Sequence, residues 1–252
     1  MILMLLFLLF SYLIAAIPFG LAITTVYGGE TDIRSAGSGN IGATNVARLY
    51  GWRLATPVLA LDIAKGALPV LIGTAIWSDQ GNLWLLLLAL APFLGHCFSI
   101  FLEFRGGKGV ATGAGALLVL APLPMLATVI LWAALLGVFG RSSMASLISA
   151  LFLLIVAALL KLAALPAILL LCAGIAYTHT ANIQRLVRGE EKQVMRPVRW
   201  ARPKPATMSV HAMLNDSVSG QGSGPALWRE DTSDPLTDSD GETPQLFPTE
   251  VD

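Results

Sequence analysis

Long apolar runs, each close to the length of a membrane-spanning helix, alternate with short polar segments along this chain. The runs lie near residues 2–26, 54–77, 82–102, 143–160 and 162–178. A helix needs about 20 predominantly apolar residues to cross the hydrocarbon core of a bilayer. The first run is interpreted as a span rather than a signal peptide, because no basic residue precedes it. The pattern predicts an all-α polytopic membrane protein.

A further apolar stretch, residues 110–139, is too long for one ordinary span and holds Pro122 and Pro124. Proline removes a backbone donor and favours a helix break, so the stretch is predicted to split there. The first piece, about 12 residues long, is short for a full crossing and is either a thin span or a re-entrant helix shielded by its neighbours. About seven transmembrane helices are therefore expected, one of them short or re-entrant.

This split places the polar segments 30–53, 103–109 and 179–204 on one side of the membrane. Most of the Lys and Arg residues outside the apolar runs lie in these segments, whereas the opposite loops hold only Lys161. The positive-inside rule makes the shared side cytoplasmic, with the N-terminus outside and the C-terminus inside.

Composition divides the chain in two. Hydrophobic residues make up 55% of it and charged residues 13%, with a mean hydropathy of +0.71, which suits lipid as the solvent. Residues 1–204 hold 15 Lys+Arg against 7 Asp+Glu, whereas residues 205–252 hold 1 against 9 and are rich in Ser, Asp, Thr, Gly and Pro. We expect a membrane domain over 1–204 and an acidic, disordered cytoplasmic tail over 205–252. The cysteines, Cys97 and Cys172, lie in apolar runs and indicate neither disulfides nor a metal site.

The first polar segment combines glycines with hydrogen-bond donors and a cation. Its glycines let backbone N–H groups turn toward a ligand, its Ser, Thr and Asn side chains add donors, and an arginine offers a planar cation for phosphate oxygens. A capped turn between helices is the plainer alternative, which so many polar groups disfavour. The candidate residues are Gly37, Ser38, Gly39, Asn40, Gly42, Thr44, Asn45 and Arg48.

The second segment is a glycine-rich loop that opens a helix. Free amides, the helix dipole and Lys108 are expected to point at one place and to form a phosphate cradle from Gly106, Gly107, Lys108 and Gly109. It is not the P-loop of nucleotide hydrolases, because Gly109 follows the lysine, so no nucleotide is implied. The alternatives are a flexible interfacial turn for the loop and, for His96, a packed polar residue.

The third segment follows the last span. If the helix continues, His179 and Asn182 share a face at spacing i,i+3, as do Asn182 and Arg185. The histidine could otherwise be a helix cap, and the arginines could hold anionic headgroups. Asp62 and Lys65 lie three apart inside the second span, where they are expected to pair with each other or to face the polar site.

These motifs resemble those of the bacterial acyl-phosphate:glycerol-3-phosphate acyltransferases, the PlsY family. The matching stretches are Gly37-Ser38-Gly39-Asn40-Ile41-Gly42-Ala43-Thr44-Asn45-Val46-x-Arg48, Gly106-Gly107-Lys108-Gly109-Val110-Ala111-Thr112 and His179-x-x-Asn182-Ile183-x-Arg185-Leu186. The resemblance covers roughly residues 10–195 and leaves the tail outside. That family has seven spans, in agreement with the predicted split.

The resemblance implies transfer of a fatty acyl chain from a long-chain acyl phosphate to the 1-hydroxyl of glycerol 3-phosphate. The products are 1-acyl-glycerol 3-phosphate and phosphate, the first committed step toward phosphatidic acid in the bacterial inner membrane. No cofactor or metal and no nucleic acid is implied, but a functional link to the enzyme that supplies acyl phosphate is. By carry-over, catalytic roles fall to Ser38, Arg48, Lys108, His179 and Asn182, and substrate binding to Gly37, Gly39, Asn40, Thr44, Asn45, Gly106, Gly107 and Gly109.

The resemblance leaves the proton acceptor open between His179 and a substrate phosphate oxygen, and favours the substrate. A His-x-x-x-x-Asp pair is absent, because Ile100, Ile183 and Asn215 stand fourth after the three histidines. Three departures from the family pattern bear on affinity: Ala15-Ala16 where Gly-Ser is common, Ser99 for a usual proline and Glu103 for a usual glycine. The rival hypotheses are a carrier for a phosphorylated metabolite, disfavoured by the lack of internal repeats, and a lipid-binding protein without catalysis.

Overall fold

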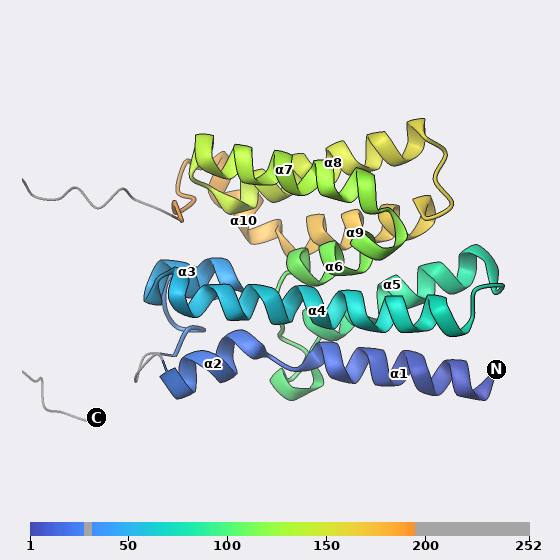
Figure 1. The fold of residues 1–252 in the computed structure, drawn as a ribbon. Helices are drawn as coiled ribbons and strands as arrows, with labels where there is room; N and C mark the ends of the chain where they lie inside the picture. Colours follow the sequence, from blue (N-terminus) through green and yellow to red (C-terminus); the bar gives the residue numbers. More distant parts are fainter. Residues whose placement is uncertain (28–31, 195–252) are drawn as a thin grey trace, which may run out of the picture. The chain divides into compact units, whose positions relative to one another are not determined.

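The computed structural model describes residues 1–27 and 32–194, and within these ranges the regular structure is helical (Figure 1). The predicted all-α fold is confirmed. The predicted tail, 205–252, and the end of the predicted membrane domain, 195–204, lie outside the described residues. In chain order the elements are α1 (Ile2–Ala16), α2 (Phe19–Tyr27), α3 (Ala43–Tyr50), α4 (Trp52–Ile76), α5 (Gly81–Cys97), the 3-10 helix η1 (Ile100–Leu102), α6 (Val110–Leu120), α7 (Pro122–Phe139), α8 (Ser142–Leu159), α9 (Leu165–Thr178) and α10 (Thr180–Val187).

Five helical stretches of the described chain are long and apolar enough to cross a bilayer: Ile2–Tyr27, Trp52–Ile76, Gly81–Leu102, Pro122–Phe139 and Ser142–Leu159. The α9–α10 pair is a sixth if its two parts, bent by 59°, are counted as one span. With the shorter apolar helix α6, these are the seven apolar segments predicted. The protein is thus an integral, multi-pass membrane protein.

The first span differs from the expected single helix, because it breaks at Ile17 and Pro18. Proline has no N–H to continue the ladder, so carbonyls before it lose their helical partners. Side chains from later in the chain donate to these carbonyls: Lys65 Nζ, on α4, to the Ile17 carbonyl at 2.9 Å, and Ser99 Oγ, between α5 and η1, to the Ala16 carbonyl at 2.6 Å. The break therefore anchors two later segments to the first span.

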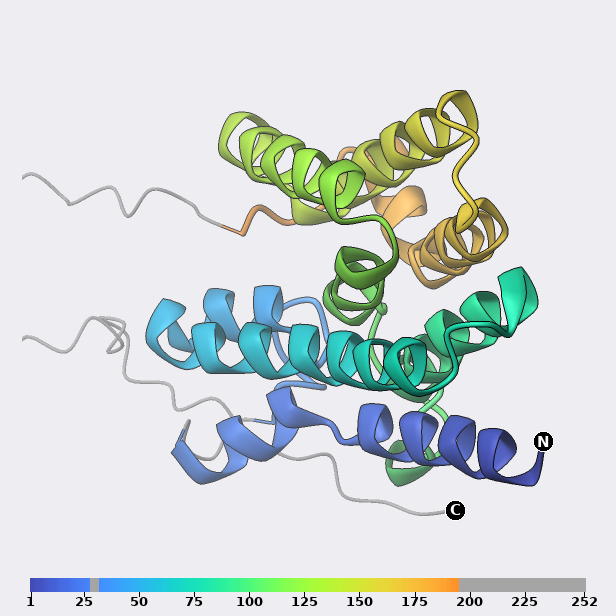
Figure 2. The ribbon, with the colours of Figure 1, turned by 45° about the vertical axis from the view of Figure 1, so that its right-hand side comes forward.

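The predicted split of residues 110–139 is confirmed, with the break at Ala121. The 11 residues of α6 extend for about 17 Å, short of the ~30 Å hydrocarbon core. Glycines let α6 lie directly against the middle of α4, because a Cβ at Gly66 would collide with the Thr112 carbonyl and one at Gly115 with the Ile63 carbonyl. As a result, α6 begins part-way into the bundle rather than at its end (Figures 1 and 2).

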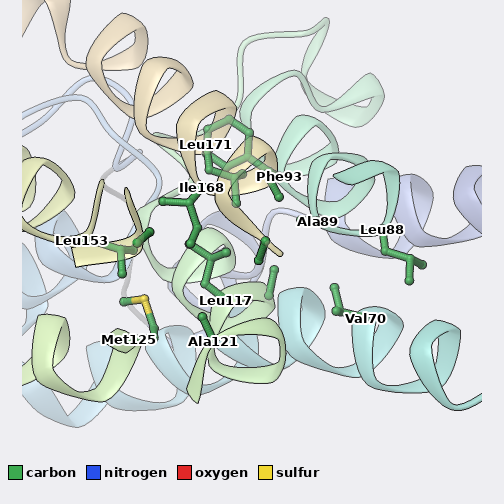
Figure 3. Packing of buried hydrophobic residues seen from close by; sticks show 14 of the residues in the cluster. Val70, Leu88, Ala89, Phe93, Leu117, Ala121, Met125, Leu153, Ile168 and Leu171 are labelled. Atoms are coloured by element: carbon green, nitrogen blue, oxygen red, sulfur yellow. The ribbon is translucent and has the colours of Figure 1, made fainter. Parts of the chain in front are cut away.

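A hydrophobic core packs the short helix α6 against α5 and α9. Phe93, Leu117, Ile168 and Leu171 are at most 3% exposed and lie together (Figure 3). The Phe93 ring also fills the space beside Gly109, at the start of α6. Burial of these side chains thus fixes the position of the loop that precedes α6.

Candidate active site

Three polar segments that are far apart in the sequence meet around one cavity of about 220 Å³. Among the residues predicted for the site, nine line it: Ser38, Asn40, Gly42, Thr44, Arg48, Lys108, Gly109, His179 and Asn182. The other five, Gly37, Gly39, Asn45, Gly106 and Gly107, lie in the same segments but do not line the cavity. The three polar segments therefore come together in the structure, as their expected position on one side of the membrane requires.

Asn45 organises the first segment from within. Its Nδ2 donates to the Ile33 carbonyl at 3.0 Å and to the Ala36 carbonyl at 3.1 Å, and its Oδ1 accepts from the Ser38 N–H at 2.8 Å. The side chain is 1% exposed, and both of its donor hydrogens are used inside the loop. Asn45 therefore shapes the loop that carries Ser38, whereas the sequence suggested a donor to ligand. Arg48 NH1 adds a donor to the same Oδ1 at 3.0 Å.

Two helix N-termini open onto the cavity. The first turn of α3 contributes Ala43 and Thr44, and the first turn of α6 contributes Val110 and Ala111. Amides in a first helical turn have no acceptor within their own helix, and the helix dipole adds partial positive charge there. Together with the cations Arg48 and Lys108, these ends can hold two anionic groups.

The glycine loop before α6 differs from its prediction in one respect. The Gly106 N–H donates to the Cys97 carbonyl at 3.0 Å and the Gly107 N–H to the His96 carbonyl at 2.9 Å, so these amides are not free for a ligand. The available amides are instead those of the first turn of α6. A Cβ at Gly106 would collide with the His96 carbonyl, and one at Gly107 with His96 Nε2. The two glycines therefore allow the loop to lie close to α5.

Lys108 projects into the cavity, and its backbone is fixed from the opposite side. Thr178 Oγ1 donates to the Lys108 carbonyl at 3.0 Å, joining the end of α9 to the loop. Burial lowers the pKa of the Lys108 amine to about 8, with Glu191 opposing the shift and the cations Arg185 and Arg48 adding to it. The amine is still mostly protonated at neutral pH and can bind a phosphate oxygen.

His179 stands at the 59° bend between α9 and α10, so the third segment is not one straight helix. Its side chain is 2% exposed, and its Nδ1 lies 2.7 Å from the Ile175 carbonyl. A carbonyl can only accept, so the proton is on Nδ1 and Nε2 is left as an acceptor. His179 and Asn182 both line the cavity despite the bend.

Glu191 is the residue that the sequence reasoning missed. Its Oε1 accepts from Ser143 Oγ and from Asn182 Nδ2, both at 2.6 Å, and its Oε2 accepts from Arg185 Nε at 2.8 Å. Burial alone would raise the pKa of this carboxyl, but the hydrogen bonds from Ser143, Arg185 and Asn182 outweigh it and hold the pKa below its usual 4.5. Its immediate sequence did not mark this role, because Ser143, one of the donors to its carboxylate, lies on a different helix.

The segment 190–194 ties the walls of the site together. Arg48 Nε donates to the Gln193 carbonyl at 3.3 Å, Arg141 Nε to the Glu191 carbonyl at 3.2 Å, and Lys192 Nζ to the Gly37 carbonyl at 3.0 Å. The Val194 N–H also donates to the Gly140 carbonyl at 2.7 Å. This closing segment thereby connects the first polar loop with the start of α8.

The rest of the cavity, which runs between α6, α7, α8 and α9, is mostly apolar, with Thr128, Ser146 and Ser149 among the residues that line it. Its walls are built from Leu117, Met125, Val129, Leu153, Leu171 and Cys172. The polar end with its cations and helix N-termini thus continues into space of the kind that hydrocarbon chains fill.

A model of the glycerol-3-phosphate acyltransferase family matches residues 5–189. Curated relatives with that name include one from Campylobacter jejuni subsp. doylei, 41% identical over 198 residues that cover 74% of this chain and 96% of the relative. Another, from Gluconobacter oxydans, is 44% identical over 193 residues, covering 74% and 90%. The chain belongs to the glycerol-3-phosphate acyltransferase family.

Solved structures agree with this membership. The crystal structure of PlsY, an integral membrane glycerol 3-phosphate acyltransferase, in its glycerol 3-phosphate form superimposes with a TM-score of 0.71 at 32% identity, covering 75% of this chain and 94% of that one. Its lysophosphatidic acid form gives 0.67 at 33% identity, with the same coverage. The protein is therefore a PlsY-type integral membrane acyltransferase, and the resemblance drawn from its motifs is confirmed.

Two of the departures from the family pattern have structural places in this acyltransferase. Ser99 uses its hydroxyl to bind the Ala16 carbonyl freed at the break in the first span. Glu103 is exposed in a left-handed backbone conformation, and it does not line the cavity. The predicted partnership of Asp62 with Lys65 is confirmed by a buried ion pair of 2.9 Å.

Proposed function

We propose that this protein transfers a fatty acyl group from acyl phosphate to the 1-hydroxyl of sn-glycerol 3-phosphate, giving 1-acyl-glycerol 3-phosphate and inorganic phosphate. One observation carries the proposal: two helix N-termini and two cations face one cavity that continues into apolar space. Both substrates carry a phosphate, and the donor also carries a hydrocarbon chain. The related PlsY structures, in glycerol 3-phosphate and lysophosphatidic acid forms, support the acceptor and the product.

Each cation is proposed to bind the phosphate of one substrate, and Lys108 also to neutralise the phosphate that leaves the donor. Arg48, with Ser38 and Thr44 beside the start of α3, binds one anionic group, and Lys108 at the start of α6 binds the other. The family motifs assign glycerol 3-phosphate to the loop of Lys108, with Gly106, Gly107 and Gly109 shaping it. Asn40 lines the part of the cavity beside Arg48. Gly37, Gly39 and Asn45 shape the first polar loop.

The chemistry is one acyl transfer. The 1-hydroxyl oxygen attacks the carbonyl carbon of the acyl phosphate, a carbon–oxygen ester bond forms, and the bond from that carbon to the phosphate oxygen breaks. Acyl phosphate is a mixed anhydride with a good leaving group, so alignment and stabilisation of negative charge suffice, without a covalent enzyme intermediate. Lys108 and Arg48 stabilise the charge on the departing phosphate.

The hydroxyl proton has two proposed destinations, His179 Nε2 or an oxygen of the departing phosphate. The proton on His179 Nδ1, held by the Ile175 carbonyl, keeps Nε2 able to accept. Asn182, fixed by Glu191, completes this wall. His179→Gln keeps hydrogen bonding but cannot take the proton: a sharp loss of rate with an unchanged pH profile would assign the proton to the phosphate.

We place the site on the cytoplasmic face of the bacterial inner membrane, with the N-terminus outside. The basic polar segments support this orientation through the positive-inside rule. Because acyl phosphate is reactive and amphiphilic, the enzyme that makes it is expected to supply it close to the membrane.

Product formation by the purified protein in detergent tests the donor directly. Glycerol 3-phosphate is the acceptor, and palmitoyl phosphate and palmitoyl-CoA are compared as donors. We expect lysophosphatidic acid from palmitoyl phosphate alone. Product from the CoA ester would assign a different donor, and no product from either would reject the reaction.

A further inference from the structure

A buried polar cluster lies behind the glycine loop and is not used by the proposed reaction. Asp62, Lys65 and His96 are 2%, 3% and 5% exposed. Lys65 Nζ bonds both Asp62 Oδ1 and the Ile17 carbonyl at 2.9 Å, which fixes the carboxylate in place. His96 Nδ1 lies 3.7 Å from the same Oδ1. Polar groups are costly to bury inside a membrane bundle, so a cluster of three calls for a role.

The two nitrogens of His96 face different surroundings. Nδ1 is buried, has no hydrogen-bond partner among the described residues and faces the Asp62 carboxylate. A carboxylate favours the proton on the nitrogen that faces it, which leaves Nε2 as an acceptor. Nε2 lies against Gly107, directly beneath the loop that carries Lys108. Asp62 and His96 both line the cavity.

His96 Nε2, with the Asp62 carboxylate on the other side of the ring, is expected to bind a hydroxyl group rather than a second anion. Asp62 would repel a phosphate, whereas a hydroxyl can donate to Nε2. If glycerol 3-phosphate is held at Lys108, the hydroxyl closest to its phosphate is that on C2, one carbon nearer than the reacting hydroxyl on C1. The C2 hydroxyl is therefore the group that a side chain lying against Gly107 would reach.

We propose that His96 Nε2, oriented by Asp62, accepts a hydrogen bond from the C2 hydroxyl of glycerol 3-phosphate and so selects this acceptor over alcohols that lack it. The inference rests on the proposed function, because it needs the acceptor phosphate at the loop of Lys108. His96 contacts substrate, whereas Asp62 is a positioning residue whose own charge is held by Lys65.

The test compares two acceptors on each preparation of full-length protein in detergent, with palmitoyl phosphate as donor. One acceptor is sn-glycerol 3-phosphate, and the other is 3-hydroxypropyl phosphate, which keeps the phosphate and the primary hydroxyl but lacks the C2 hydroxyl. We expect the wild type to prefer glycerol 3-phosphate in kcat/KM by at least about tenfold, the usual weight of such a hydrogen bond. Because the ratio is taken within one preparation, a change in the folded fraction cancels.

Two variants of His96 separate the nitrogens. His96→Asn leaves an amide near the position of Nδ1 and removes Nε2, so the preference should fall to about one. His96→Gln places an amide near Nε2 and should restore part of it. Thr112→Val is the matched control, because its buried hydroxyl also has no hydrogen-bond partner among the described residues but does not line the cavity. It should keep the wild-type preference.

Two results would overturn the inference: a wild type with no preference, or a preference that survives in His96→Asn. A preference that survives while kcat/KM falls equally with both acceptors would assign His96 to packing or to proton transfer. Failure of the proposed function looks different, because the wild type would then form no ester from palmitoyl phosphate with either acceptor.

Discussion

The first polar loop, which precedes α3, and the glycine loop, which precedes α6, each bring a helix N-terminus and one cation to the cavity. The two loops are stabilised in opposite ways. The first is held from inside by one polar side chain, Asn45, which bonds three backbone groups of the loop. The glycine loop is held by backbone hydrogen bonds from Gly106 and Gly107 to α5. These bonds can form because neither residue has a side chain that would collide with α5. Shortening a side chain should therefore destabilise the first polar loop, whereas enlarging one should destabilise the glycine loop.

The largest effects are expected at the cations themselves, in both loops alike. Arg48→Ala and Lys108→Ala should each lower kcat/KM by about a hundred- to a thousandfold, the range seen when one group that stabilises developing charge is removed. Both proteins should stay folded, as judged by gel filtration in detergent. Arg53→Ala is the control, because Arg53 is exposed and does not line the cavity. Wild-type turnover in either cation variant would contradict the site.

Adding one methyl group to the glycine loop should be the next most damaging change. Gly107→Ala would force a Cβ against the His96 ring, and overpacking of this kind costs about 1–3 kcal/mol. The thermal unfolding midpoint and the affinity for glycerol 3-phosphate should both fall. Gly137→Ala, on α7, has no atom near the added Cβ and should lower neither. Equal behaviour of the two variants would mean that the loop can move away freely.

Removing atoms from the first loop should have a comparable or smaller cost. Asn45→Ala leaves the Ser38 N–H and the Ile33 and Ala36 carbonyls without their partner, at about 1–3 kcal/mol in unfolding free energy. Asn45→Asp keeps the acceptor but loses both donors, so its loss should come between wild type and Asn45→Ala. An Asn45→Ala protein as stable and active as wild type would show that the loop is not held by this side chain.

The smallest effect should come from raising the pH, and it should act through the glycine loop. Burial lowers the pKa of Lys108 to about 8, so at pH 9 about one amine in ten remains protonated and kcat/KM should fall about tenfold. Bound phosphate favours the cation, so kcat should fall at higher pH than kcat/KM. Lys108→Arg should remove this alkaline limb, because arginine stays charged. A limb that persists in this variant belongs to another group.

Much of this arrangement could be predicted from the sequence. The apolar runs and the two prolines located the helices, including the split at Ala121, because solvation by lipid leaves few alternatives for an apolar run of that length. Nine of the fourteen residues that the motifs named line one cavity. From the cost of a lone charge, Asp62 and Lys65 were expected either to pair or to face the polar site; they pair, and Asp62 also lines the cavity.

What could not be predicted depends on contacts between distant segments. The break at Pro18 was not expected, because its compensation comes from Lys65 and Ser99, far along the chain. The amides of Gly106 and Gly107 are occupied because α5 lies beside them. Glu191 carries no local signature of its own, since its role depends on Ser143 and Asn182 converging on it.

The late position of Glu191 in the chain has a consequence for biosynthesis. A membrane protein is made and inserted from its N-terminus, so the wall that contains Arg48 exists long before the segment 190–194 that closes the site. An intermediate that lacks this segment can have Arg48 in place but not the Gln193 carbonyl to which Arg48 donates. We therefore expect the site to be complete only after the segment 190–194 has been made and has joined the first polar loop to the start of α8.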